Sequence, residues 1–197
     1  MILIEVASQH PLLNGITPGR EFSLRLDKGI ELYKKLVKQK NQVKIYVPGS
    51  RHRIMVDGHY VDDKISLSEA GYNYLVAHGF PKNDIYALEK SKQYAPDGIY
   101  STIEECETTS KIFKNEKFER LYSIAASEQI GRMQGAYEYF GILGDVEFIG
   151  IDEHEVFHNK AESEEKRLRF LSDPEKTMHE IYVNARKERV PADGRIW

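Results

Sequence analysis

Residues 120–140, RLYSIAASEQIGRMQGAYEYF, have the pattern of a strand that runs directly into a helix. The apolar run at 120–126 has the length of a buried strand, and 127–140 has a helical pattern that Gly141 ends. A strand followed at once by a helix is the repeating unit of a parallel sheet with helical crossovers. This stretch therefore predicts an α/β fold.

The same alternation extends in both directions along the chain. Further strands are expected at 2–7, 43–47, 84–88 and 146–151. Helices are expected at 23–39, 66–79 and 101–115, and charged helices broken at Asp173-Pro174 form a C-terminal tail. The alternation predicts a mainly parallel sheet with helices on both faces. We expect one domain over 1–151, on which a helical extension over 152–197 packs.

The composition narrows the class of function. Charged residues make up 30% of the 197 residues and the set AVILMFWYC 41%, which is typical of a globular protein and not of a disordered one. A net charge of −3, with Lys and Arg spread along the chain, provides no basic surface for nucleic acid or membrane. No run approaches the roughly 20 apolar residues that cross a membrane. Cys106 is the single cysteine and the N-terminus lacks a signal-peptide pattern, so we expect a cytoplasmic protein that works on a small molecule.

Polar segments follow the predicted strands at the edge where such sheets bind ligands. These segments are the Gly49-Ser50-Arg51-His52 loop, Ser101-Thr102, and Ser127 with Arg132. Backbone N–H groups and the dipole at helix starts attract anions, so an anionic ligand is expected. The alternative is structural: Ser66, Ser101 and Ser127 only cap helices, Glu69 and Glu104 only complete capping boxes, and residues 51–53 are a solvated charge run. The loop at 48–65, about 18 residues, is longer than most connections.

The order of these motifs resembles a bacterial family of unknown function typified by the YdcF, SanA and ElyC proteins, over about residues 1–151. Five segments carry the resemblance: Arg25-Leu26 opening a helix, IYVPGSRH at 45–52, Ser68-Glu69-Ala70 opening a helix that ends in GFP at 79–81, Ser101-Thr102-Ile103-Glu104-Glu105, and Ser127 to Arg132. The chain departs from the family pattern where a second loop glycine is missing, where Ser101 replaces Asn, and where Gln129 replaces His.

The resemblance implies a Rossmann-like three-layer α/β sandwich, and S-adenosylmethionine as a ligand, because one relative is associated with it. We therefore expect a small-molecule enzyme or cofactor-binding protein that holds an anionic, nucleotide-like ligand at the carboxyl edge of the sheet. A general acid or base must be titratable and within hydrogen-bond reach of the ligand. The candidates for that role are Glu69, Glu105 and His52. The candidate cofactor-binding residues are Gly49, Ser50, Arg51, Ser101, Thr102, Glu104, Ser127 and Arg132.

Two other functions stay open. His154-Glu155-Val156-Phe157-His158 matches the His-Glu-x-x-His pattern of zinc hydrolases, which requires both histidines on one helix. The motif directly follows a predicted strand and precedes Asn159, which favours a polar loop, although Asp152 or His154 reaching a ligand or a divalent ion is also compatible with that position. The third function is a non-catalytic sensor whose 48–65 loop closes on a ligand.

Overall fold

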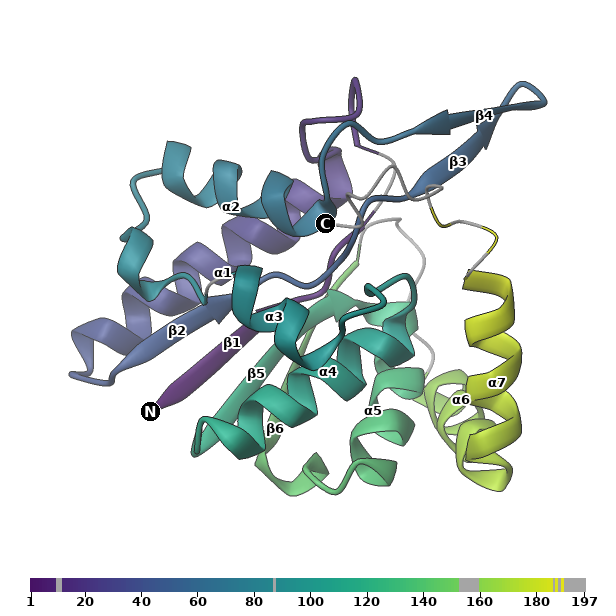
Figure 1. The fold of residues 1–197 in the computed structure, drawn as a ribbon. Coiled ribbons are helices and arrows are strands. Elements are labelled where there is room, and N and C mark those ends of the chain that lie inside the picture. The colour runs from purple at the N-terminus through teal and green to yellow at the C-terminus, as the bar shows by residue number, and fades with distance from the viewer. Residues whose placement is uncertain (10–11, 87, 153–159, 186, 188, 190–197) are drawn as a thin grey trace.

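The computed structural model describes residues 1–9, 12–86, 88–152, 160–185, 187 and 189 (Figure 1). Its centre is a four-stranded, all-parallel sheet in the order β2 (Val43–Tyr46), β1 (Ile2–Val6), β5 (Arg120–Ala126) and β6 (Val146–Ile151). Within it, Glu5 of β1 is in register with Tyr46 on one side and with Ser123 on the other. The predicted α/β sandwich with a mainly parallel sheet is confirmed.

Helices cover both faces of the sheet, as Figure 1 shows. Helices α1 (Arg20–Lys38) and α2 (Leu67–Ala77) pack on the face formed by Ile4, Val6 and Ile45. Helices α4 (Thr102–Asn115) and α5 (Ile130–Tyr139) pack on the opposite face, against Leu3 and Leu121. The alternation of side chains along each strand therefore supplies two separate cores.

The C-terminal helices are α6 (Lys160–Ser172) and α7 (Pro174–Ala185); α6 packs against α5, and α7 contacts α6 (Figure 1). Phe170 of α6 is buried in the same core as α4 and α5. Asp173 precedes the proline that begins α7, and its carboxylate accepts a hydrogen bond from the N–H of Lys176 at 3.1 Å. The break predicted at Asp173-Pro174 is present.

The strand predicted at 84–88 is wrong. A short 3₁₀ turn, η1 (Lys82–Asp84), leads into a single parallel bridge between Ile85 and Ile45, and α3 (Leu88–Tyr94) begins three residues later. The apolar run is therefore too short for a strand, because α3 begins at its last residue.

The long segment at 48–65 is not a structureless loop. It contains an antiparallel hairpin of β3 (Arg53–Val56) and β4 (His59–Asp62), which projects from the body in Figure 1. Asp57 and Gly58 at its tip have φ values of 48° and 79°. Two consecutive positive φ values define the tight turn that favours Asp-Gly in two-residue hairpins. That dipeptide was the signal for the hairpin.

Candidate functional site

A cavity of about 100 Å³ lies at the carboxyl edge of the sheet. At this place β1 and β5 are neighbouring strands. From β1 the chain crosses to β2 on one side, and from β5 it crosses to β6 on the other side. Such a reversal of strand order is where ligands bind in open parallel sheets. The lining residues are Ser8, Gln9, His52, Leu67, Tyr100, Ser101, Thr102, Glu105 and Gln129.

Arg25 fixes the turn that leaves β1. Its guanidinium is fully buried and donates to the carbonyl oxygens of Ala7 at 3.1 Å and Ser8 at 3.2 Å, and to Oε1 of Gln9 at 3.0 Å. A charged group with several donors in fixed geometry holds a loop more firmly than a neutral one. The position of Ser8 at the cavity is therefore set by the first turns of α1.

Glu105, on the first turns of α4, is a buried carboxyl group in the cavity wall. Its Oε1 accepts a hydrogen bond from the Ser8 hydroxyl at 2.7 Å. Burial raises the pKa of Glu105 from 4.5 to about 8, and the nearby Glu5 carboxyl adds to this, whereas Ser8 and Arg25 act in the opposite direction. A carboxyl group with a pKa close to neutrality can both donate and accept a proton under ordinary conditions.

Glu5 lies behind Glu105, inside the sheet and away from the cavity lining. Its carboxylate is fully buried and accepts three hydrogen bonds, from Thr109 at 2.5 Å, Ser123 at 2.6 Å and Tyr137 at 2.5 Å. Burial raises the pKa of Glu5, and the three hydroxyl donors partly oppose this. The three donors make Glu5 a structural link between β1, β5, α4 and α5.

Glu104 and Glu105 are neighbours at the start of α4, but their side chains have different contacts. The N–H of Glu104 donates to the Ser101 hydroxyl at 3.3 Å, and Oε2 of Glu104 accepts from the N–H of Tyr100 and from Ser101, both at 2.9 Å. Glu104 is thus held by the cap, and burial raises its pKa. It does not line the edge cavity. Ser101 and Thr102 do, as expected for the helix start.

The loop after β2 approaches the cavity through its backbone. Gly49 has φ of 118°, and a Cβ there would lie 2.5 Å from the Ser8 hydroxyl oxygen and 2.8 Å from Cβ of Leu67. Only glycine fits at this position. The Ser50 N–H donates to the carbonyl of Ile99 at 3.0 Å, and the Ser50 hydroxyl accepts from the N–H of Ile99 at 2.8 Å. The contacts of Ser50 therefore tie the loop to the segment before α4.

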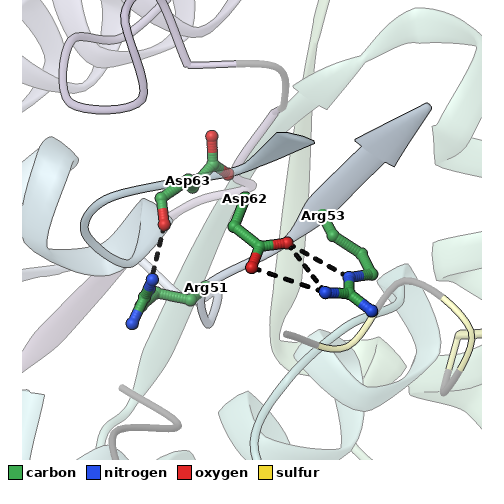
Figure 2. A network of polar contacts seen from close by, with 4 residues as sticks. All are labelled: Arg51, Arg53, Asp62 and Asp63. Carbon is green, nitrogen blue, oxygen red and sulfur yellow. Dashed lines mark hydrogen bonds and ion pairs between the residues drawn. The ribbon is translucent and has the colours of Figure 1, made fainter. Parts of the chain in front are cut away.

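His52 enters the cavity wall, but its neighbour Arg51 does not. The buried His52 ring lies 5.3 Å from the Tyr100 ring, and the His52 carbonyl accepts from the N–H of Asp63 at 2.9 Å. Figure 2 shows Arg51 directed to the carbonyl of Asp63, which it reaches through Nε at 2.9 Å. The same view shows Arg53 paired with the Asp62 carboxylate at 3.1 Å. These contacts hold the base of the hairpin together.

Three further candidates from the sequence lie outside the cavity lining. The N–H of Glu69 donates to the Ser66 hydroxyl at 3.0 Å, so this pair forms a helix cap. Ser127 begins the short turn η2 (Ser127–Gln129) and packs against Gly150, where a Cβ would lie 2.5 Å from its hydroxyl. Arg132 is exposed on α5. The structure thus brings His52, Ser101, Thr102 and Glu105 together, and it leaves the predicted arginines apart from them.

A second, wider cavity of about 330 Å³ lies on the other side of the α4 start. Tyr100 lines both cavities. In the wider one, the Tyr182 hydroxyl donates to Oε2 of Glu107 at 2.7 Å, and Glu107 also pairs with Lys111 at 2.7 Å. Arg189 stands over the Tyr100 ring at 5.7 Å. The wider cavity therefore combines aromatic rings with charges of both signs.

Sequence reasoning did not select Ser8, Gln9, Arg25 or Tyr100 as site residues. Arg25 carried a signal, because it lies among the apolar positions of an amphipathic helix, where an arginine needs a specific partner. Ser8 carried a weaker one, since it directly follows a strand. The position of Tyr100 depends on tertiary structure alone.

The His154-Glu155-x-x-His158 segment lies outside the described residues. Within the part of the chain that is described, no three His, Cys, Asp or Glu side chains are grouped to hold a metal ion. No described helix has the length and apolar character needed to cross a membrane. Of residues 152–158, the structure describes Asp152, which is exposed.

Two comparisons with known proteins add no further information. No protein-family model matches the chain, and a search of curated proteins found no match to it.

Proposed function

We propose that the chain is a small-molecule enzyme in which Glu105 exchanges a proton with a ligand bound in the edge cavity. The observation that carries this proposal is a buried carboxyl group in the cavity wall whose pKa is raised to about 8. Titratable groups with strongly shifted pKa values in a cleft are typical of catalytic sites. The candidate Glu69 has weaker support, because it belongs to the cap of α2 and does not line the cavity.

The charge of the cavity defines the group that it accepts. At pH 7 a carboxyl group with a pKa near 8 is mostly protonated and donates a hydrogen bond. The other polar lining groups are hydroxyls, amides and the His52 ring, and neither Arg51 nor Arg132 is among them. We therefore infer that the edge cavity binds a neutral polar group of the ligand, and not the anionic group that the sequence suggested.

The size of the cavity limits what it can hold. At about 100 Å³ the edge cavity is much smaller than the wider cavity of about 330 Å³. A nucleotide-like ligand would therefore extend beyond the edge cavity. We propose that the larger part lies in the wider cavity, where rings of Tyr94, Tyr100 and Tyr182 offer stacking surfaces. S-adenosylmethionine is the first ligand to test, because of the resemblance to the YdcF-type family. We also propose that the chain belongs to that family and that it is cytoplasmic.

Calorimetric titration with S-adenosylmethionine tests this function. We expect binding whose affinity changes as the pH rises from 6 to 9, with proton uptake or release that depends on the buffer. Glu105→Gln should bind with little pH dependence, because the replacement cannot ionise. Glu147→Gln removes an exposed carboxylate on β6 and should behave as the wild type.

Two results would count against the proposal: no binding at millimolar ligand, or the same proton exchange in Glu105→Gln as in the wild type. Binding without any turnover would favour the sensor function instead. That result would leave the cavity as a ligand site while removing the catalytic role of Glu105.

A further inference from the structure

We propose that Ser8 is a nucleophile, that Glu105 is its base, and that the edge cavity acts on short-chain carboxylic esters through an acyl-Ser8 intermediate. This inference rests on the proposed function in using the same cavity and the same carboxyl group. It goes further in naming a covalent step and a substrate class.

The Ser8–Glu105 pair has the geometry of an activated hydroxyl. The Ser8 hydroxyl has a single proton, and that proton is directed to Oε1 of Glu105 at 2.7 Å. A nucleophile within 2.6–3.2 Å of its base is the arrangement common to enzymes with covalent intermediates. Both residues line the cavity, so the lone pairs of the Ser8 oxygen are available to a bound ligand.

The surroundings hold Ser8 in this position from two sides. Arg25 bonds to the carbonyls of Ala7 and Ser8, which fixes the backbone. Gly49 approaches the Ser8 hydroxyl so closely that any side chain would displace it, since an added Cβ would lie 2.5 Å away. A nucleophile held by backbone on one side and by its base on the other is positioned before the substrate arrives.

Gln129 adds an independent sign of a ligand. Its amide oxygen Oε1 is buried and has no hydrogen-bonding partner among the described residues. An unsatisfied buried amide costs free energy unless a ligand or a water completes it. Gln129 lines the cavity together with Thr102, so a ligand that donates a hydrogen bond can complete the Gln129 oxygen, and the Gln129 NH₂ group and the Thr102 hydroxyl are the candidate donors for the oxyanion of a bound acyl group.

The lining favours a neutral ester over a phosphate ester. Phosphoryl transfer needs cations or metal ions to balance the negative charge of the transferred group. The cavity lining contains no Arg or Lys, and its carboxyl group would repel a phosphate once it ionised. A carbonyl carbon is neutral, and a short acyl group matches a volume of about 100 Å³.

The reaction balances without a further reactant apart from water. The Ser8 oxygen bonds to the carbonyl carbon while its proton moves to Glu105. The bond to the alcohol then breaks, and the alcohol leaves with the proton from Glu105. Water, deprotonated by Glu105, next attacks the acyl-Ser8 carbonyl, the acid leaves, and Ser8 recovers its proton.

Incubation with p-nitrophenyl acetate, followed by intact-protein and peptide mass spectrometry, tests this inference. We expect release of p-nitrophenol and one acetyl group located on Ser8. Ser8→Ala should lose both, and Glu105→Gln should lower the rate of acylation by about 100-fold or more. Ser172→Ala, which changes an exposed serine at the end of α6, should match the wild type.

The acylation rate should also rise with pH and level off above about 8, as Glu105 ionises. Hydrolysis at the wild-type rate by Ser8→Ala, an adduct on other residues only, or no reaction at all would overturn the inference. The proposed function would survive these results if S-adenosylmethionine still bound with proton exchange that Glu105→Gln removed. The two proposals therefore fail separately.

Discussion

The sheet interior around Glu5 and the sheet edge around Glu105 contain the same chemical group in two different surroundings. Both carboxyl groups are buried, and burial raises both pKa values. Glu5 is enclosed by three hydroxyl donors, whereas Glu105 has Ser8 as its side-chain donor and faces a cavity. Burial alone thus does not make a carboxyl group reactive. The free space beside it and the accessible partner decide whether it stabilises the fold or performs chemistry.

The interior site should be the more sensitive to truncation. Glu5→Ala removes the acceptor of Thr109, Ser123 and Tyr137 and leaves three buried hydroxyls without their partner. At about 1–3 kcal/mol for each unsatisfied group, we expect a loss of at least ~3 kcal/mol in the free energy of unfolding. Urea denaturation measures it, with Glu105→Ala as the comparison. Equal losses in the two variants would remove the distinction between interior and edge.

Glu105, at the sheet edge, should determine much of the change in stability between pH 6 and 9. The pKa of Glu105 is raised from 4.5 to about 8, so the folded protein binds its proton more tightly than the unfolded chain. This stabilisation is complete below pH 4.5 and is lost as the pH rises through about 8, with an effect on the order of a few kcal/mol. We expect the wild type to lose more stability than Glu105→Gln between pH 6 and 9 in thermal denaturation. Parallel curves for the two proteins would contradict the assignment.

A substitution at Gly49 should disturb the sheet edge around Glu105 and leave the contacts of Glu5 unchanged. Gly49→Ala places a Cβ in an unfavourable backbone region at φ of 118° and against the Ser8 hydroxyl. We expect a cost of about 1–3 kcal/mol in the free energy of unfolding and a loss of the Ser8–Glu105 contact. Calorimetric unfolding together with p-nitrophenyl acetate turnover checks both effects. Full turnover in a destabilised variant would show that Ser8 tolerates displacement.

The hairpin provides a control region, where a substitution should have a small effect on stability and none on the edge cavity. Arg53 and Asp62 form an exposed ion pair at 3.1 Å, with side-chain exposures of 21% and 37%. Exposed ion pairs contribute about 0–1 kcal/mol to stability. Arg53→Ala should therefore lower the free energy of unfolding by no more than about 1 kcal/mol and leave ligand binding unchanged. The same denaturation and titration experiments measure it. A large effect on binding would extend the functional site to the hairpin.

The sequence predicted the sheet because its signals are local. The apolar runs at 2–7 and 120–126, and the caps at Ser66 and Ser101, depend on neighbours within a few residues, and the structure contains all of them. The hairpin was missed although Asp57-Gly58 is a local signal. The strand at 84–88 failed because a helix begins inside it.

The site was harder to predict, because side-chain direction depends on the whole fold. Glu104 and Glu105 are adjacent in sequence, but successive helix positions point about 100° apart. One therefore completes a cap and the other enters the cavity. Arg132 and Arg51 were plausible anion ligands by position along the chain, yet the first is exposed and the second binds a hairpin carbonyl. Sequence order locates the edge of a sheet, but not which side chains meet there.

The carboxyl carbon signals of ¹³C-labelled glutamate, followed by NMR as a function of pH, report whether Glu105 exchanges a proton near neutral pH. We expect one side-chain signal that titrates with a midpoint of about 8 and disappears in Glu105→Gln. If the signal lost in Glu105→Gln instead titrates near the ordinary glutamate value of 4.5, Glu105 is ionised throughout the neutral range. Its role as the proton-exchanging group of the edge cavity would then be wrong.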